Sequence, residues 1–234
     1  SARTTRKPGR RGSLRWRQRA CIVFGGTYPN SVLRAGLDAG QTLTIGAGIT
    51  VHGSTGGQGG TVDAASALIN EGTIAADAGQ TVTLAGSGLT NTGTIQANGG
   101  TVYLAGTYRT PQLGTLRNSG GVIYLSGALD NAGATLSLNA ATGVLSLASG
   151  TITGGTVSAE AGGGLAVAGS GVLSAVTLNT DLTVSDRSTL TVRDGLTLAD
   201  GHRVVLNSTI WGAGLSFAGA SQTLGGDGEV VFGG

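Results

Sequence analysis

Large side chains, charges and prolines are scarce in this sequence. Aromatic residues make up 4% of its 234 residues and methionine is absent, so one bulky globular core is not expected. Charged residues reach 11%, against about a quarter in ordinary globular chains. Three prolines are too few for a collagen-like or proline-rich disordered chain. The apolar residues are mainly Leu, Val, Ile and Ala, a composition that favours many small, similar layers.

Several kinds of segment and site are also excluded by what is missing. No apolar run approaches the roughly 20 residues that span a bilayer, so we expect no membrane insertion. One cysteine and two histidines are too few for a zinc site, and the glycine-rich stretches 56–60 and 225–229 do not complete a calcium-binding repeat. We therefore expect no metal and no cofactor. No apolar signal-peptide segment follows the basic N-terminus, and whether the chain is a whole subunit or a fragment stays open.

Glycine, in contrast, is abundant, with 45 residues, and it recurs in a short repeated phrase. The phrase Leu-x-Asn-x-Gly occurs four times, beginning at Leu68, Leu89, Leu116 and Leu129. A second phrase, Thr-Val-x-Leu-Ala-Gly, follows the first two copies, at 81–86 and again at 101–106. A period near 20 residues is typical of a solenoid, in which each unit buries its apolar face by stacking on its neighbours.

Apolar residues alternate with polar ones along most of the chain, which predicts half-buried β-strands. Three such strands make one coil of about 20 residues. The sequence therefore predicts an all-β fold, a right-handed parallel β-helix, with no α-helix of consequence. The inward side chains are expected to include Val82, Leu84, Val102, Leu104, Leu136 and Leu138.

Two regions are expected: a basic N-terminal arm with a short strand at 1–33, and the β-helix at 34–234, with repeats clearest at 66–135. The copies of the asparagine phrase are 21, 27 and 13 residues apart. The long spacing contains 107–112, which we interpret as a loop that bulges from one coil. The short spacing implies that two copies lie on different sides of successive coils.

The asparagine of each phrase is expected to stack above its equivalent, with the side-chain amides bonded along a column. The residues of this turn and ladder are Asn70, Asn91, Asn118 and Asn131. Glycines 72, 79 and 93 are expected at corners, where glycine tolerates a positive φ.

Charge is divided unevenly along the chain. Residues 1–19 hold eight arginine and lysine residues and no acid, and the remainder holds six arginines against twelve acids. Such an arm binds polyanions in general, but nucleic acid is not the expected partner, because the body is acidic and Trp16 is the arm's one aromatic residue. The acidic body of a second copy is the partner that we expect.

The stretches 79–86 and 89–95 resemble the repeats of filamentous-haemagglutinin-type adhesins and related bacterial β-strand-repeat surface proteins. The likeness extends over roughly 34–234. It implies a secreted or cell-surface protein that serves as an adhesin, a stalk or a matrix component, with surface glycans or a host surface as possible partners. The Asn-Pro-Asn-type motifs of two-partner secretion are missing, so the export route stays open.

An enzyme is the alternative, because parallel β-helices also include polysaccharide hydrolases and lyases. Asn-Thr-Asp at 179–181 and Gly-His at 201–202 resemble parts of polygalacturonase-type motifs. Those enzymes need paired carboxylates, and no second Asp follows Asp181. Side chains of Asp181 and His202 more than about 10 Å apart would exclude this alternative.

The function that we expect is a non-catalytic extracellular structural protein, adhesin- or matrix-like, that assembles into a filament by head-to-tail stacking of coils. Its arm is expected to lie along the next subunit, and Cys21 is either buried or paired with a second copy. The expected contact residues are Arg10, Arg11, Arg15, Trp16, Arg17, Arg19, Cys21, Ile22, Val23, Phe24, Val230 and Phe232.

Overall fold

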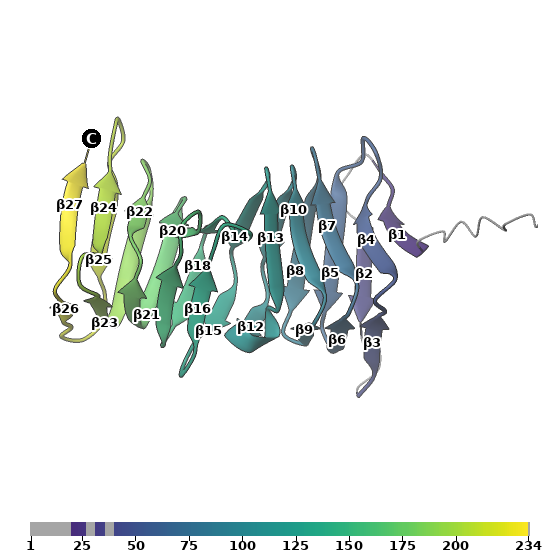
Figure 1. The fold of residues 1–234 in the computed structure, drawn as a ribbon, viewed down its shortest axis with the longest axis horizontal. Helices are drawn as coiled ribbons and strands as arrows, with labels where there is room; N and C mark the ends of the chain where they lie inside the picture. Colours follow the sequence, from purple (N-terminus) through teal and green to yellow (C-terminus); the bar gives the residue numbers. More distant parts are fainter. Residues whose placement is uncertain (1–19, 27–30, 36–39, 234) are drawn as a thin grey trace, which may run out of the picture.

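The computed structural model describes residues 20–26, 31–35 and 40–233. It is all-β, with 63% strand and about 1% helix, and its parallel strands stack as a β-solenoid with about 21 residues per turn. The predicted parallel β-helix is therefore confirmed. Figure 1 shows a rod with β1 (Ala20–Phe24) at one end and β27 (Glu229–Gly233) at the other.

One sheet, here called the long sheet, runs from end to end of the rod. Its ten strands, all parallel, are β2 (Ser31–Ala35), β5 (Gly59–Ala64), β8 (Thr81–Gly86), β11 (Thr101–Leu104), β14 (Val122–Leu125), β17 (Val144–Leu147), β20 (Gly164–Val167), β22 (Leu182–Val184), β24 (Arg203–Asn207) and β27.

The other faces of the rod are divided among three sheets. A five-stranded sheet holds β1, β4 (Ile49–Gly53), β7 (Thr73–Asp77), β10 (Thr94–Asn98) and β13 (Thr115–Ser119). A three-stranded sheet holds β3 (Thr42–Ile45), β6 (Ala67–Asn70) and β9 (Leu89–Asn91). The last sheet holds β12 (Thr107–Arg109), β15 (Ala128–Asp130), β16 (Thr135–Leu138), β18 (Gly150–Thr153), β19 (Thr156–Ala159), β21 (Ser170–Asn179), β23 (Thr189–Leu198), β25 (Gly214–Phe217) and β26 (Leu224–Gly226).

The core is a set of aliphatic columns that run along the rod axis. In the long sheet, one column passes through Leu84, Leu104, Leu125, Leu147, Val167, Val184 and Leu206, all buried and in register. The six residues predicted to point inward are all buried. Each fully buried Leu or Val adds about 1.5 to 3 kcal/mol of stability, so the columns supply most of the stabilisation.

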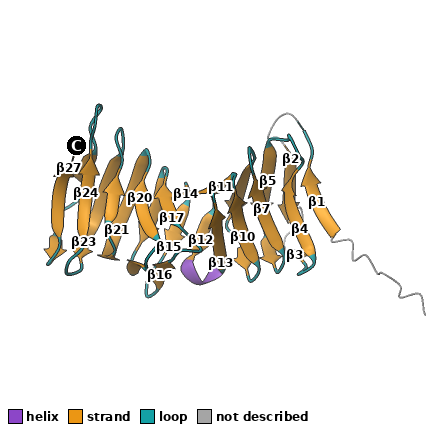
Figure 2. Ribbon diagram, turned by 45° about the horizontal axis from the view of Figure 1, so that its top comes forward, coloured by secondary structure: helices purple, strands orange, loops and turns teal. Residues whose placement is uncertain are grey.

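One coil, residues 107–119, interrupts the regular stack on two faces. The three-stranded sheet ends at β9 and the five-stranded sheet ends at β13, while the long sheet continues through β11 and β14. The corner between β9 and β10 has two residues, and the corner between β12 and β13 has five, at 110–114. Those extra residues include a 3-10 turn, η1 (Thr110–Gln112), which is the purple element in the middle of the rod in Figure 2.

The prediction of a bulging loop at 107–112 was wrong for its first half. Tyr108 lies on β12 with 1% of its surface exposed, and its hydroxyl donates a hydrogen bond of 2.7 Å to the carbonyl oxygen of Leu84 in the preceding coil. The backbone N–H of Gly106 donates to the same hydroxyl at 3.0 Å. Because both groups are buried, the ring belongs to the core of this coil.

The corner glycines serve two different physical purposes. Gly79 has φ +76°, as predicted. Gly72 and Gly93 are not in the left-handed region, so that part of the prediction was wrong. A Cβ atom on Gly93 would lie 2.1 Å from the carbonyl oxygen of Gly72, so glycine is needed here because successive corners stack closely.

Candidate functional site

The strongest candidate for chemistry is the pair named by the enzyme alternative. Asp181 precedes β22 and His202 precedes β24, and the two lie one turn apart. The imidazole Nδ1 of His202 is 3.4 Å from Oδ1 of Asp181, so separation does not exclude the enzyme alternative. Arg203 donates its backbone N–H to the same oxygen at 3.1 Å, and its Nε lies 3.6 Å from Oε1 of Glu229.

The surroundings of this cluster are open to solvent. The side chains of Asp181 and Glu229 are 56% and 62% exposed. The acid carboxyl group of a glycosidase usually lies in a partly buried site, whereas both of these carboxylates are exposed. Neither the cavity beside β16 nor the one beside β23 includes these residues. The geometry is that of surface ion pairing.

The same pairing recurs at other outward positions of the rod. Nε of Arg34 is 2.8 Å from Oδ2 of Asp63, and the two residues are register partners on β2 and β5. Further pairs of this kind, each between neighbouring coils, are His52 with Asp77 at 3.3 Å and Arg109 with Asp130 at 3.5 Å. Asp181 and His202 therefore belong to a general pattern in which acidic and basic side chains on adjacent coils contact each other.

No family model, curated protein or solved structure matches this chain. The likeness to adhesin repeats consequently stays a prediction, and the functional argument depends on the geometry of the rod. In the described part of the chain, no cluster of three or more His, Cys, Asp or Glu side chains has the arrangement of a metal site. Over the same residues, no helix has the length and apolarity needed to cross a bilayer.

The predicted asparagine column exists in part. Nδ2 of Asn70 donates to Oδ1 of Asn91 at 2.7 Å, and Nδ2 of Asn91 donates to the carbonyl oxygen of Leu113 at 2.7 Å. Two turns beyond Asn91, Oδ1 of Asn131 accepts from the hydroxyl of Thr110 at 2.7 Å. Thr110 and Leu113, from the irregular corner, thus take the place of an asparagine.

Asn118 is not in this column, so its assignment there was wrong. It lies on β13, on another face, opposite Ala97 of β10, and its Oδ1 accepts the N–H of Gly121 at 2.9 Å. The implication of the short spacing, that two phrases occupy different faces, was correct. The column begins at Asn70, whose Oδ1 is buried without a partner, because the residue before it in register is Ile45.

Gln80 is a structural residue that the sequence reasoning missed. Its buried side chain accepts the N–H of Gly53 at 3.0 Å and donates to the carbonyl oxygen of Ser54 at 2.9 Å. It also accepts the N–H of Asp77 at 3.2 Å. The sequence signal for this structural role was the position of Gln80, a polar residue between Gly79 at a corner and the inward Val82.

At the C-terminal end of the rod, side chains in register with the core are exposed. Phe232 continues the column of Leu206 and is 85% exposed. Phe217 follows Val192, and Leu224 follows Leu196, and both are also exposed. Val230, which we expected to be a contact residue, is half-buried against the last coil. We call this exposed edge of the described stack the open core.

The N-terminal end is partly closed by Phe24. This side chain is 4% exposed and takes the space of a core residue above Gly60, where a Cβ atom would be 2.6 Å from the ring. Phe24 is thus a core residue of the single chain, and its role as a subunit contact stays a prediction. Cys21, Ile22 and Val23 are exposed, so Cys21 is not buried. The predicted contacts Arg10, Arg11, Arg15, Trp16, Arg17 and Arg19 lie outside the described residues.

A surface loop at 208–212 was not predicted from the sequence. Oδ1 of Asp186 accepts the backbone N–H groups of Thr209, Ile210 and Trp211, at 3.3, 3.4 and 2.9 Å. These hydrogen bonds hold the pKa of Asp186 below its ordinary value, that of Trp211 contributing most. The guanidinium of Arg187 covers the Trp211 ring at 4.3 Å, so the loop presents an ordered, exposed indole.

Proposed function

We propose that this chain is a non-catalytic structural protein of the extracellular surface or matrix, and that its rods associate head to tail. The observation that carries the proposal is the open core at the C-terminal end, where Phe232 continues a buried column into solvent. Exposed apolar surface of this kind marks an interaction site. The rod's solvated outward pairs, such as Asp181 with His202, join neighbouring coils and need no substrate.

The two ends are complementary in strand direction and in side-chain pattern. The outer edge of β27 and the outer edge of β2 belong to the same parallel sheet, so a second copy extends that sheet without reversal. Continuing the register places Leu33, which follows the inward column of Val62, over Phe232. Such a contact is heterologous, does not close, and produces a fibre. The basic arm 1–19 adds attraction to the acidic body.

The assembly state of the full chain tests this proposal. We expect the full chain to form fibres in electron micrographs and to sediment as large species, and we expect Phe232→Asp to abolish both. Val144→Asp is the matched control, because Val144 is exposed on the outer face in mid-rod and away from both ends. Deleting residues 1–19 and adding salt should each weaken the fibres. A full chain that stays monomeric at high concentration would contradict the proposal.

The second candidate, a glycan-active enzyme, is favoured by the 3.4 Å contact between Asp181 and His202. It predicts reducing ends or unsaturated products from acidic polysaccharides, and their loss in Asp181→Asn. Exposure of both carboxylates in the cluster favours the structural role.

A further inference from the structure

Two neighbouring strands in mid-rod, β13 and β16, face each other without pairing. The same two coils pair normally elsewhere, through β14 with β17 and through β12 with β15. On this one face the five-stranded sheet ends at β13 and the next strand, β16, pairs with β19 on its far side. We call the space between them the β13–β16 gap. It contains a cavity of about 190 Å³.

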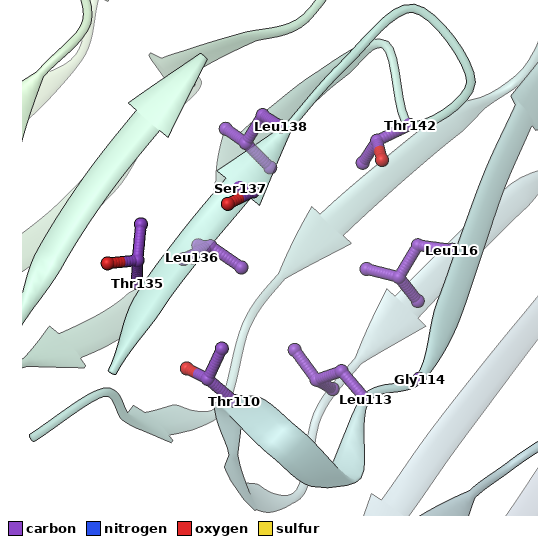
Figure 3. A pocket seen from close by; sticks show the side chains of 9 residues that line it. All are labelled: Thr110, Leu113, Gly114, Leu116, Thr135, Leu136, Ser137, Leu138 and Thr142. Atoms are coloured by element: carbon purple, nitrogen blue, oxygen red, sulfur yellow. The ribbon is translucent and has the colours of Figure 1, made fainter. Parts of the chain in front are cut away.

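Both ends of the gap are bridged by polar contacts. At one end stands η1, whose Thr110 hydroxyl bonds to Asn131. At the other end the turn 139–143 crosses, because the N–H of Asn118 donates to the carbonyl oxygen of Ala141 at 2.7 Å. Figure 3 shows Thr110 and Thr142 at the two ends, with Leu113 and Leu116 on one side and Leu136 and Leu138 on the other. The corners therefore set the opening.

The backbone groups that face the gap belong to the edges of two strands, β13 and β16. Elsewhere, the N–H of an outward residue donates to the preceding coil, as Thr156 does to Ala134 at 3.0 Å. Thr135 and Ser137 are the register equivalents of Thr156 and Ser158, so their peptide groups are directed into the gap. On the opposite edge, the peptide groups of Leu116 face the gap, and the N–H of Asn118 is already bonded to Ala141. Within the described residues, no strand pairs with either edge.

The side chains that line the gap define the chemistry of its ligand. Leu113, Leu116, Leu136 and Leu138 are buried and form an apolar floor. The lining also includes Thr110, Thr135, Ser137 and Thr142, and it includes no charged residue. A ligand that fits must be uncharged and must put an apolar group inward. It must also offer N–H and C=O groups on both sides, which an extended polypeptide does.

We propose that the β13–β16 gap is an acceptor slot for one extended, uncharged peptide strand that pairs with both edges. The strand alternates small polar and aliphatic residues, as the neighbouring strands do, and its aliphatic side chain lies on the leucine floor. Two open edges that face each other satisfy both sides of one strand, whereas a rod end satisfies one side. The slot goes beyond the proposed structural function, and it does not depend on head-to-tail association.

A labelled peptide tests the slot. The probe is fluorescein-labelled Gly-Thr-Ile-Gln-Ala-Asn, which copies residues 93–98 and so the strand that pairs with β13 on its other side. We expect saturable anisotropy changes with the full chain, and slower hydrogen exchange at the amides of Thr135 and Ser137. N-methylation of alternate peptide residues should weaken binding at least roughly tenfold, because each methyl group removes a donor.

Two variants keep the test specific. Leu116→Trp fills the cavity and should prevent binding, and Leu104→Met, buried in an ordinary strand pair, is the control for a changed core residue. The proposal is overturned if the probe does not saturate at millimolar concentration, or if N-methylated and unmodified peptides bind equally. It is also overturned if protection appears at β27 in place of β16, because the probe would then bind the rod end.

Discussion

The coils before and after the irregular coil keep the same fold by different means. In the first part, residues 42–106, repeated residues stack on their own kind, as Asn70 does on Asn91 and Gly72 on Gly93. In the second part, residues 120–233, the ten-residue strands β21 and β23 turn from one face to the next without a loop, at Ala175 with φ 53° and Asp194 with φ 56°. Register there does not depend on identical side chains.

The comparison teaches which features a stacked coil needs. Both parts keep the inward aliphatic columns of the long sheet, and these pass through the irregular coil unchanged. Corners vary from no loop to six residues. The sequence repeat therefore decays where corners vary, although the strands continue to stack, because burial of the columns supplies the driving force.

The largest expected effect comes from the same substitution in the two parts. In Gly93→Ala, the new Cβ meets the Gly72 carbonyl oxygen at 2.1 Å, and the backbone must move, at a cost of about 3 kcal/mol. Gly133 lies at a corner of the second part with φ +68°, and a Cβ added there has no atom within 4 Å. Gly133→Ala should therefore cost only about 1 kcal/mol of stability, from the left-handed backbone. Urea unfolding followed by circular dichroism measures both. Equal losses would mean that the first part is no more tightly registered than the second.

Much of the fold could be predicted because burial in a strand alternates with period two. Val82 and Leu84 illustrate this, since local pattern alone assigns them to the core. Tyr108 could not be placed in this way, because the Pro and Arg nearby favour a loop, and its hydroxyl partner is 24 residues away. Asn118 carries the same phrase as Asn91, but the five-residue corner shifts its phase onto another face.

The candidate sites also divide into features that the sequence pattern could predict and features that it could not. Asp181 and His202 could be paired from the sequence because 21 residues are one turn of the rod. The loop held by Asp186 could not be found, because its partners are backbone N–H groups, which leave no side-chain pattern. The β13–β16 gap was also hidden, since it arises from the length of a corner and from no motif.

The next effect tests the coil where the two parts meet. Tyr108→Phe removes the donor to Leu84 and the acceptor for Gly106, and we expect it to cost about 2 kcal/mol. Burial raises the pKa of Tyr108 to about 12, an effect that the N–H of Gly106 partly opposes. The neutral ring is thus the form that the fold favours, and this contribution to stability is complete below the unfolded pKa of about 10.

As pH rises from about 10 to about 12, that contribution is lost, by roughly 3 kcal/mol at the upper limit. We expect the urea midpoint of the native chain to fall over this range more steeply than that of Tyr108→Phe. Absorbance at the phenolate band, compared between the two proteins, assigns the titration to this residue. If the urea midpoints of the two proteins fall in parallel with pH, burial of Tyr108 in the irregular coil does not raise its pKa.

The smallest effect is local, in the second part, where a carboxylate orders the loop 208–212 without repeated side chains. The pKa of Asp186 is held below its ordinary value of 3.8, chiefly by the N–H of Trp211. A lowered folded pKa means that this contribution is complete above the unfolded pKa and is lost as pH falls through the folded pKa. Trp211 should therefore change its fluorescence in acid while the far-ultraviolet spectrum stays constant. Trp16→Phe leaves Trp211 as the one indole, and in that background Asp186→Asn should give the acid-like emission at neutral pH. If emission follows the global spectrum instead, the loop is held by the stack and not by this carboxylate.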